Sequence, residues 1–181
     1  LFCGGTNSGE NQGVVLPFEM PLIGSGKIIT DASLTFNLFS KRPGTDAAEF
    51  EADLYVSRVA SSPVVQPGDF DRTGANTMLQ KAVISYESDG EVSIDPSAGE
   101  ALADWLNEGD RYQGGDYVFL SIVPDKDYGS IAQSGGENIG FPIASSNHHS
   151  SGNHPSLTWF AATTYGLTVE QGSGSGDYVV G

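Results

Sequence analysis

Apolar and polar residues alternate along most of this chain, in short runs separated by glycine, proline, aspartate and serine. In one run, Leu34, Phe36 and Leu38 fall on one side of an extended backbone, and Ser33, Thr35 and Asn37 fall on the other. This alternation is typical of half-buried antiparallel strands. It predicts strands at 14–18, 32–39, 50–59, 78–85, 91–94, 117–123, 131–132, 141–144, 157–161, 165–169 and 178–180.

The run YVFLSIV, residues 117–123, is apolar at nearly every position. A strand that is apolar on both sides belongs in the middle of a sheet with both faces covered. We expect an opposing sheet on one face of this strand and a helix or long loop on the other. Its composition therefore indicates packing and not chemistry.

One segment has helical spacing. Ser97 and Glu100 stand at capping-box spacing, and Gly109 offers a left-handed stop. The residues on the apolar face are Ala101, Leu102, Trp105 and Leu106. The sequence predicts a short helix at 98–107.

The chain of 181 residues is long enough for one domain with its own core. We expect a single domain over 1–181, with an extended N-terminal arm at 1–12 and a Gly/Ser linker and terminal strand at 172–181. The predicted fold is mainly β, an antiparallel jelly-roll-like β-sandwich with one short helix.

The charge balance changes what the protein is expected to bind. Eight basic and 23 acidic residues give a formal net charge of −15, which argues against nucleic acid as a partner. The same charge attracts cations, and calcium is the candidate ion. No apolar run is long enough to predict a membrane span. Low lysine with abundant glycine favours a secreted, extracellular protein, with or without attachment to a cell surface.

A candidate calcium loop begins at DFDRTG. Asp69, Asp71 and Thr73 place oxygens at alternate positions, and Gly74 permits a sharp turn. The twelfth position is Gln80 instead of a bidentate glutamate, so the segment is not an EF-hand. Solvated turn carboxylates are the competing interpretation.

Enzyme signatures fail where they are tested. IGSGKI has Ile28 where a phosphate-binding loop needs serine or threonine for magnesium, and GSGSG has glycine at the central position of a nucleophile elbow. No two carboxylates stand out as an acid and a base. We therefore expect no catalytic residues and no enzyme activity.

Aromatic and histidine residues supply the candidate ligand site. A sugar stacks its C–H face on an aromatic ring while its hydroxyls bond to polar groups at the rim. The candidate ligand-binding residues are Trp159, Tyr112, Tyr128, His148, His149, His154 and Asn147. Core packing is the competing interpretation for Trp159, and turn formation or metal ligation for the histidines.

Four stretches carry a resemblance to a known group of domains: LPFEMPLIGSGKIITDASLTFNL, ADLYVSRVASSPVVQPGDFD, GGDYVFLSIVPD and IASSNHHSSGNHPSLTW. Their order resembles the β-sandwich modules grouped with DNRLRE-type and related carbohydrate-binding modules of secreted proteins from marine and other environmental bacteria. The resemblance implies a jelly-roll-like sandwich, an extracellular location and no catalysis. The Asp-Asn-Arg tripeptide of that group is absent here, so no ligand contact carries over.

Two functions follow as expectations. The first is a non-catalytic carbohydrate-binding module that docks on extracellular polysaccharide. The second is a structural subunit of a bacterial surface layer, fibre or adhesin, in which copies of the chain assemble through their terminal strands.

Overall fold

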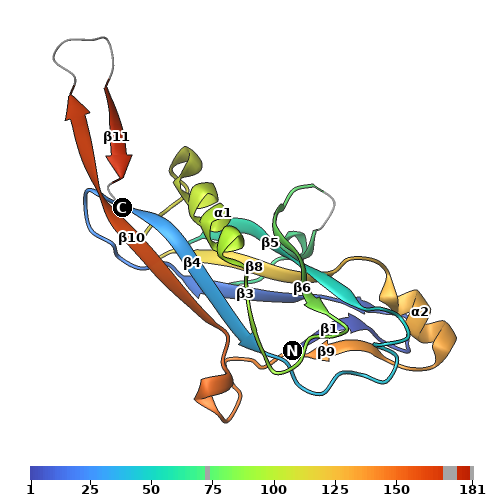
Figure 1. Cartoon of the computed structure of the whole chain (residues 1–181). Coiled ribbons are helices and arrows are strands. Elements are labelled where there is room, and N and C mark those ends of the chain that lie inside the picture. Colours follow the sequence, from blue (N-terminus) through green and yellow to red (C-terminus); the bar gives the residue numbers. More distant parts are fainter. Residues whose placement is uncertain (72–73, 169–174, 180–181) are drawn as a thin grey trace.

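The computed structural model describes residues 1–71, 74–168 and 175–179. The chain is mainly β, with three antiparallel sheets and two α-helices in these residues (Figure 1). The strands are β1 (Phe2–Gly5), β2 (Asn11–Gln12), β3 (Val14–Glu19), β4 (Lys27–Asn37), β5 (Glu51–Ala60), β6 (Thr77–Ser85), β7 (Glu91–Ser93), β8 (Tyr117–Pro124), β9 (Ile139–Pro142), β10 (Ser156–Thr168) and β11 (Ser175–Val179). The helices are α1 (Pro96–Asn107) and α2 (Tyr128–Gly135), with short 3-10 turns η1 (Pro67–Phe70), η2 (Glu108–Asp110) and η3 (Ser151–Asn153).

β8 lies inside a four-stranded sheet of order β3-β8-β5-β6. Val118, Leu120 and Ile122 point from one face into the main hydrophobic core. Phe119 and Val123 are buried on the other face, which η1 and its loop cover. The predicted central strand with two covered faces is confirmed.

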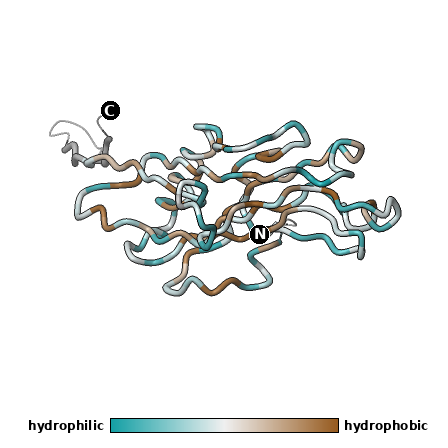
Figure 2. The backbone as a smooth tube through the Cα atoms, turned by 90° about the horizontal axis from the view of Figure 1, so that it is seen from below, coloured by the Kyte–Doolittle hydropathy of each residue, from teal (hydrophilic) through white to brown (hydrophobic). Residues whose placement is uncertain are grey.

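The second four-stranded sheet has the order β11-β10-β4-β7. Leu34 and Phe36 of β4 are fully buried and belong to the same core as β3, β5 and β8. In Figure 2, hydrophobic stretches lie in the middle of the molecule and in some outer loops, and hydrophilic stretches lie mostly in the outer turns. The alternation along the sequence therefore predicted the inward face correctly.

Helix α1 continues the chain after β7 and covers the edge of β4. An added Cβ at Gly99 would lie 1.9 Å from the Ala32 carbonyl oxygen, so only glycine permits this approach. The Asn107 Nδ2 group donates to the Ile29 carbonyl at 2.7 Å. The helix thus takes the position of a neighbouring strand along this part of β4.

The predicted bounds of α1 need one correction. The N-cap is Asp95, and Pro96 occupies the first helical turn, so Ser97 and Glu100 do not form the expected capping box. Proline is favoured at the first helical position because its missing N–H has no partner there in any case. Gly109 has φ 67°, as its predicted left-handed conformation requires.

The predicted N-terminal arm at 1–12 is part of the fold. β1 is the middle strand of a third sheet, of order β2-β1-β9, and pairs Cys3 with Phe141. The Cys3 side chain is completely buried. The glycine-rich sequence FCGG gave no strand signal because its conformation depends on β9, more than 130 positions away in the sequence.

Residues 131–132 were predicted as a strand, and this is wrong. They belong to α2, whose N-cap Asp127 accepts a hydrogen bond from the Ser130 backbone N–H. Gly136, with φ 73°, ends the helix. Two apolar residues are too few to distinguish a helix from a strand by periodicity. No helix in the described ranges is long and apolar enough to cross a membrane.

Candidate functional site

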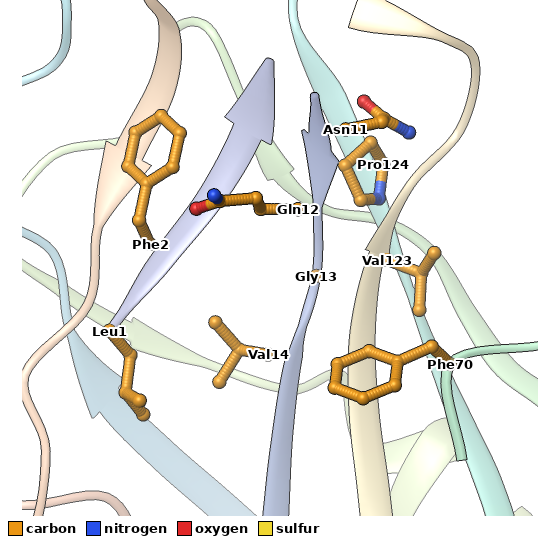
Figure 3. A pocket seen from close by; sticks show the side chains of 9 residues that line it. All are labelled: Leu1, Phe2, Asn11, Gln12, Gly13, Val14, Phe70, Val123 and Pro124. Carbon is orange, nitrogen blue, oxygen red and sulfur yellow. The ribbon is translucent and has the colours of Figure 1, made fainter. Parts of the chain in front are cut away.

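A groove of about 570 Å³ lies where the third sheet meets the β3-β8-β5-β6 sheet (Figure 3). Its lining comes from β1, the β2–β3 segment, the end of β8 and η1. The lining residues are Leu1, Phe2, Asn11, Gln12, Gly13, Val14, Phe70, Val123 and Pro124. None of these side chains is charged, and most are apolar, which is the usual composition of a binding pocket.

Gly13 lines the centre of the groove (Figure 3). It joins β2 to β3 and has no side chain to fill the space between Phe70 and Val123. A Cβ at this position would lie 3.0 Å from the Ile122 carbonyl oxygen and 3.3 Å from the Phe70 ring. Any other residue would therefore crowd the floor of the groove.

Two aromatic rings flank the groove. Figure 3 shows Phe2 on the β1 side and Phe70 on the η1 side, with Gln12 and Val14 between them. The Phe70 side chain is 39% exposed, so much of its ring is open to solvent. The Arg42 guanidinium lies 5.8 Å from the centre of the Phe2 ring and supports it from outside the groove.

An ion pair next to Phe70 holds that side of the groove in place. Arg58 donates from Nε to Asp69 Oδ1 at 2.8 Å and from Nη2 to Asp69 Oδ2 at 3.0 Å. The Arg58 guanidinium also lies over the Phe119 ring of β8, 3.8 Å from its centre. This arrangement fixes η1 on the outer face of the sheet and positions Phe70, the next residue after Asp69.

The Asp69 carboxylate is almost completely buried but well bonded. Burial by itself raises the pKa of Asp69, but hydrogen bonds from Arg58, the Gln66 backbone N–H and the Ser57 hydroxyl outweigh that effect. The pKa of this carboxyl is therefore lower than its usual value. The charged form of Asp69 stabilises the folded loop.

Two amide side chains stand at the rim of the groove. Asn11 donates from Nδ2 to the Lys126 carbonyl and accepts from the Tyr128 backbone N–H, at 3.3 and 3.2 Å. Gln12 donates from Nε2 to Glu10 at 3.3 Å. An amide group has two N–H donors and a carbonyl with two lone pairs, so one such bond leaves Gln12 with capacity for a ligand.

Of the three predicted calcium ligands, Asp69 and Asp71 are described, and Asp69 already has a cationic partner. Asp69 is committed to Arg58, and a buried carboxylate facing a guanidinium is poorly placed to bind a second cation. Asp71 follows η1 as its C-cap and is half-buried. Thr73 lies outside the described residues. Among the side chains that the structure describes, no group of three or more His, Cys, Asp or Glu residues could hold a metal ion.

Tyr128 was predicted to bind a ligand, but its ring is fully buried. The hydroxyl donates to Asp125 Oδ1 at 2.7 Å and accepts from the Glu51 backbone N–H at 2.9 Å. Burial, followed by the Asp125 carboxylate, raises the pKa of Tyr128 above its usual value. The ring packs against Phe50 and is a core residue, so it offers no stacking surface.

Tyr112 and the histidine loop lie near opposite ends of β4. The Tyr112 hydroxyl bonds to Pro21 and to the Ile23 backbone N–H, in the segment just before β4 begins. His148 packs on Phe39, two residues after β4 ends, with 5.1 Å between ring centres. Because a strand rises by about 3.3 Å per residue, these predicted residues cannot share one small ligand.

Two of the three histidines, His148 and His149, form a row of rings beside Phe39. The His148 and His149 ring centres are 4.2 Å apart, and His154 Nε2 lies 2.7 Å from the His148 carbonyl oxygen. His149 and Asn147 are exposed, and His148 and His154 are half-buried. This Phe39–His148–His149 row is a second place where a sugar ring could stack.

Trp159 is half-buried in β10, opposite Ala32 of β4, and packs against the main core. The structure therefore agrees with the interpretation of Trp159 as a packing residue. The groove residues Phe2, Gln12 and Phe70 were missed by sequence reasoning. The only local signal was Gly13, a glycine directly before an apolar strand, which can mark a close approach of side chains.

Comparison of the sequence with protein-family models and with curated proteins finds no match to either.

Proposed function

We propose that the chain is a non-catalytic carbohydrate-binding module that docks on extracellular polysaccharide through the Phe2–Phe70 groove. The observation that carries this proposal is the groove between the Phe2 and Phe70 rings, whose floor is formed by Gly13. Its volume lies within the range of small-molecule sites. The sequence resemblance to bacterial carbohydrate-binding modules, with its jelly-roll-like sandwich and secreted location, supports the same proposal.

The groove chemistry suits a neutral sugar. The flat C–H face of a pyranose ring stacks on the Phe70 ring, and the Gln12 amide bonds to a hydroxyl at the edge. Catalysis is not part of the proposal, because the groove lining holds no carboxylate to act as an acid or a base.

The net charge selects among polysaccharides. A formal charge of −15 repels sulfated and uronate polymers, so we propose neutral glycans as the ligand class. Calcium enters this proposal only as an ion that bridges the acidic surface to an anionic polymer. Binding of neutral polymers is then independent of calcium.

Affinity gel electrophoresis with soluble xylan, mannan and mixed-linkage glucan, each with calcium and with a chelator, tests the proposal. We expect retardation by at least one of these polymers in both conditions. Phe70→Ala removes one stacking surface and should weaken that binding about fivefold to tenfold. Absence of retardation by all three polymers would contradict the proposal.

Phe39→Ala is the matched control, because Phe39 is 37% exposed and Phe70 is 39% exposed. It removes an exposed ring of the histidine row and leaves the groove unchanged. We expect Phe39→Ala to bind like the wild type. If Phe39→Ala abolishes binding and Phe70→Ala does not, the sugar stacks on the Phe39–His148–His149 row and the groove assignment is wrong.

The alternative function is a structural subunit of a surface layer, fibre or adhesin that assembles through its terminal strands. β1 pairs on both sides, with β2 and β9, and β11 pairs with β10. The N-terminal strand is therefore not available to a neighbour without opening the third sheet.

A further inference from the structure

The first part of β10 has a strand partner on one side, while Thr164–Thr168 pair with β11. Residues Ser156–Thr163 pair with β4 on one side, and no other strand pairs with them in the described part of the chain. Figure 1 places β10 at the margin of the molecule, on the side of β4 away from α1. A strand edge of this length is a template for pairing with another chain.

The direction of the β10 backbone groups follows from β4. The carbonyls of Leu34, Ala32 and Ile29 point away from β10, because they face the Ile94 N–H, Gly99 and the Asn107 amide respectively.

The β10 residues opposite these three are Leu157, Trp159 and Ala161. In an antiparallel ladder, two opposed residues either exchange both hydrogen bonds or neither. The N–H and C=O groups of these three residues therefore point to the open edge.

Thr163 is the fourth residue with outward backbone groups. The N–H of its neighbour Thr164 donates to the Gly26 carbonyl at 2.8 Å, on the β4 side. Since backbone groups alternate in direction along a strand, those of Thr163 point outward. The open edge thus presents a regular series at residues 157, 159, 161 and 163.

The other long strand edges carry protection that β10 lacks. β3 has Pro17, whose ring removes a backbone donor, and β6 has Lys81 beside Ala82, whose φ of 47° breaks the regular strand. The edge of β4 is covered by β7 and α1. Proline, lysine and irregular backbone are the devices by which proteins block edge pairing. No proline or lysine occurs between Ser156 and Thr163. The β10–β4 register shifts between Phe160 and Ala161, and the extra residue at this shift, Thr30, belongs to β4.

Charge indicates which partner fits this edge. The segment from Ser156 to Thr164 contains no charged residue, in a chain with a formal charge of −15. Two copies of the chain repel one another over most of their surface, and the repulsion is weakest where both surfaces are neutral. The segment is also rich in Thr, Trp and Phe, which favour strand pairing.

We propose that the β10 edge is a homodimer interface, in which β10 of one copy pairs antiparallel with β10 of a second copy. A two-fold axis through Phe160 sets Leu157 against Thr163 of the second copy and Trp159 against Ala161, so all four outward residues are paired. A register shifted toward the N-terminal end of β10 would pair position 155, where proline has no N–H to donate. Phe160, which is 48% exposed, then faces Phe160 of the second copy.

Sedimentation equilibrium of the whole chain tests this interface. We expect a concentration-dependent monomer–dimer equilibrium. Raising the salt from about 0.01 M to about 0.15 M shortens the Debye length from about 30 Å to about 8 Å, so it should strengthen the dimer. A wild-type chain that stays monomeric at all soluble concentrations, at both salt levels, overturns the proposal.

Ala161→Pro removes an outward N–H without removing a bond to β4, and Ala161→Ser is its matched control. We expect Ala161→Pro to raise the dimer dissociation constant about tenfold or more, because the symmetric interface loses the bond twice. Ala161→Ser should dimerise like the wild type. Unchanged dimerisation of folded Ala161→Pro overturns the proposal.

Phe160→Glu covers the case in which the proline variant does not fold. Its side chain is on the exposed face, and the two-fold axis would bring the two new carboxylates together. We expect a monomer with the circular dichroism spectrum of the wild type. A dimer as tight as the wild type would contradict the proposed register. Polysaccharide binding of this variant should match the wild type, which separates the interface from the groove.

Discussion

Arg58 and Asp69 form a bidentate ion pair on the outer face of the sheet that contains β8. The Nε–Oδ1 distance is 2.8 Å and the Nη2–Oδ2 distance is 3.0 Å. The pair joins β5 to η1, and the guanidinium covers Phe119. This single contact explains how the outer face of β8 is covered and why Phe70 stands at the groove.

Asp69→Asn removes the carboxylate and leaves the Arg58 charge partly buried. We expect the free energy of unfolding to fall by about 2 kcal/mol or more, since breaking a buried ion pair is costly. Urea denaturation at neutral pH measures the change. Asp46→Asn breaks the exposed Lys41–Asp46 pair and serves as the control, with an expected change below about 1 kcal/mol. Equal effects of the two substitutions would show that η1 is not held by Asp69.

The lowered pKa of Asp69 makes part of the stability depend on pH. The unfolded carboxyl titrates near its usual value of 3.8, and the folded one titrates lower. The stabilisation is therefore complete above the unfolded pKa and is lost as the pH falls through the folded pKa. We expect the stability difference between wild type and Asp69→Asn to be largest near pH 7 and to shrink below about pH 4. A difference that stays constant down to about pH 2 would argue against this assignment.

Gly99→Ala tests the close contact of α1 with β4. The added Cβ would lie 1.9 Å from the Ala32 carbonyl oxygen, so the helix must move away from the strand. We expect a loss of about 2 kcal/mol or more, as for other overpacked sites. Gly135→Ala is the control, because a Cβ there meets no atom within 4 Å. It should be neutral or stabilise α2 by up to about 1 kcal/mol. Thermal unfolding of both variants measures the contrast.

Cys3 should be unreactive in the folded protein. Its side chain is completely buried, and burial raises the pKa of the thiol above its usual value. Because the thiolate is the reactive form, we expect no labelling by a thiol reagent at pH 8 under native conditions and full labelling in concentrated guanidinium. Rapid labelling of the native protein would show that the third sheet opens. A disulfide between two copies through Cys3 requires the same opening.

The sequence alone predicted the elements that have a strong local pattern. β4 and β5 alternate, so the pattern by itself identifies Leu34, Phe36 and Leu54 as inward residues, and all three are buried. The run at 117–123 predicted a strand with two covered faces, and α1 followed from helical spacing. The sequence predicts Asp69 as a calcium ligand because its local pattern resembles a calcium loop. The local pattern does not show that an arginine 11 positions away forms an ion pair with this carboxylate.

The alternating pattern, the net charge of −15 and the helix at α1 are properties of local sequence, because side-chain periodicity and composition need no partner to be recognised. The tertiary structure decided the rest. FCGG became a central strand only by pairing with β9, and Tyr128 became a core residue only by packing on Phe50. The groove joins residues from four separate segments. The open edge at Ser156–Thr163 exists because β4 pairs with these residues on one side and no second strand in the described chain pairs with them. Contacts between residues so far apart in the chain depend on how the sheets are ordered, and no short stretch of sequence encodes that order.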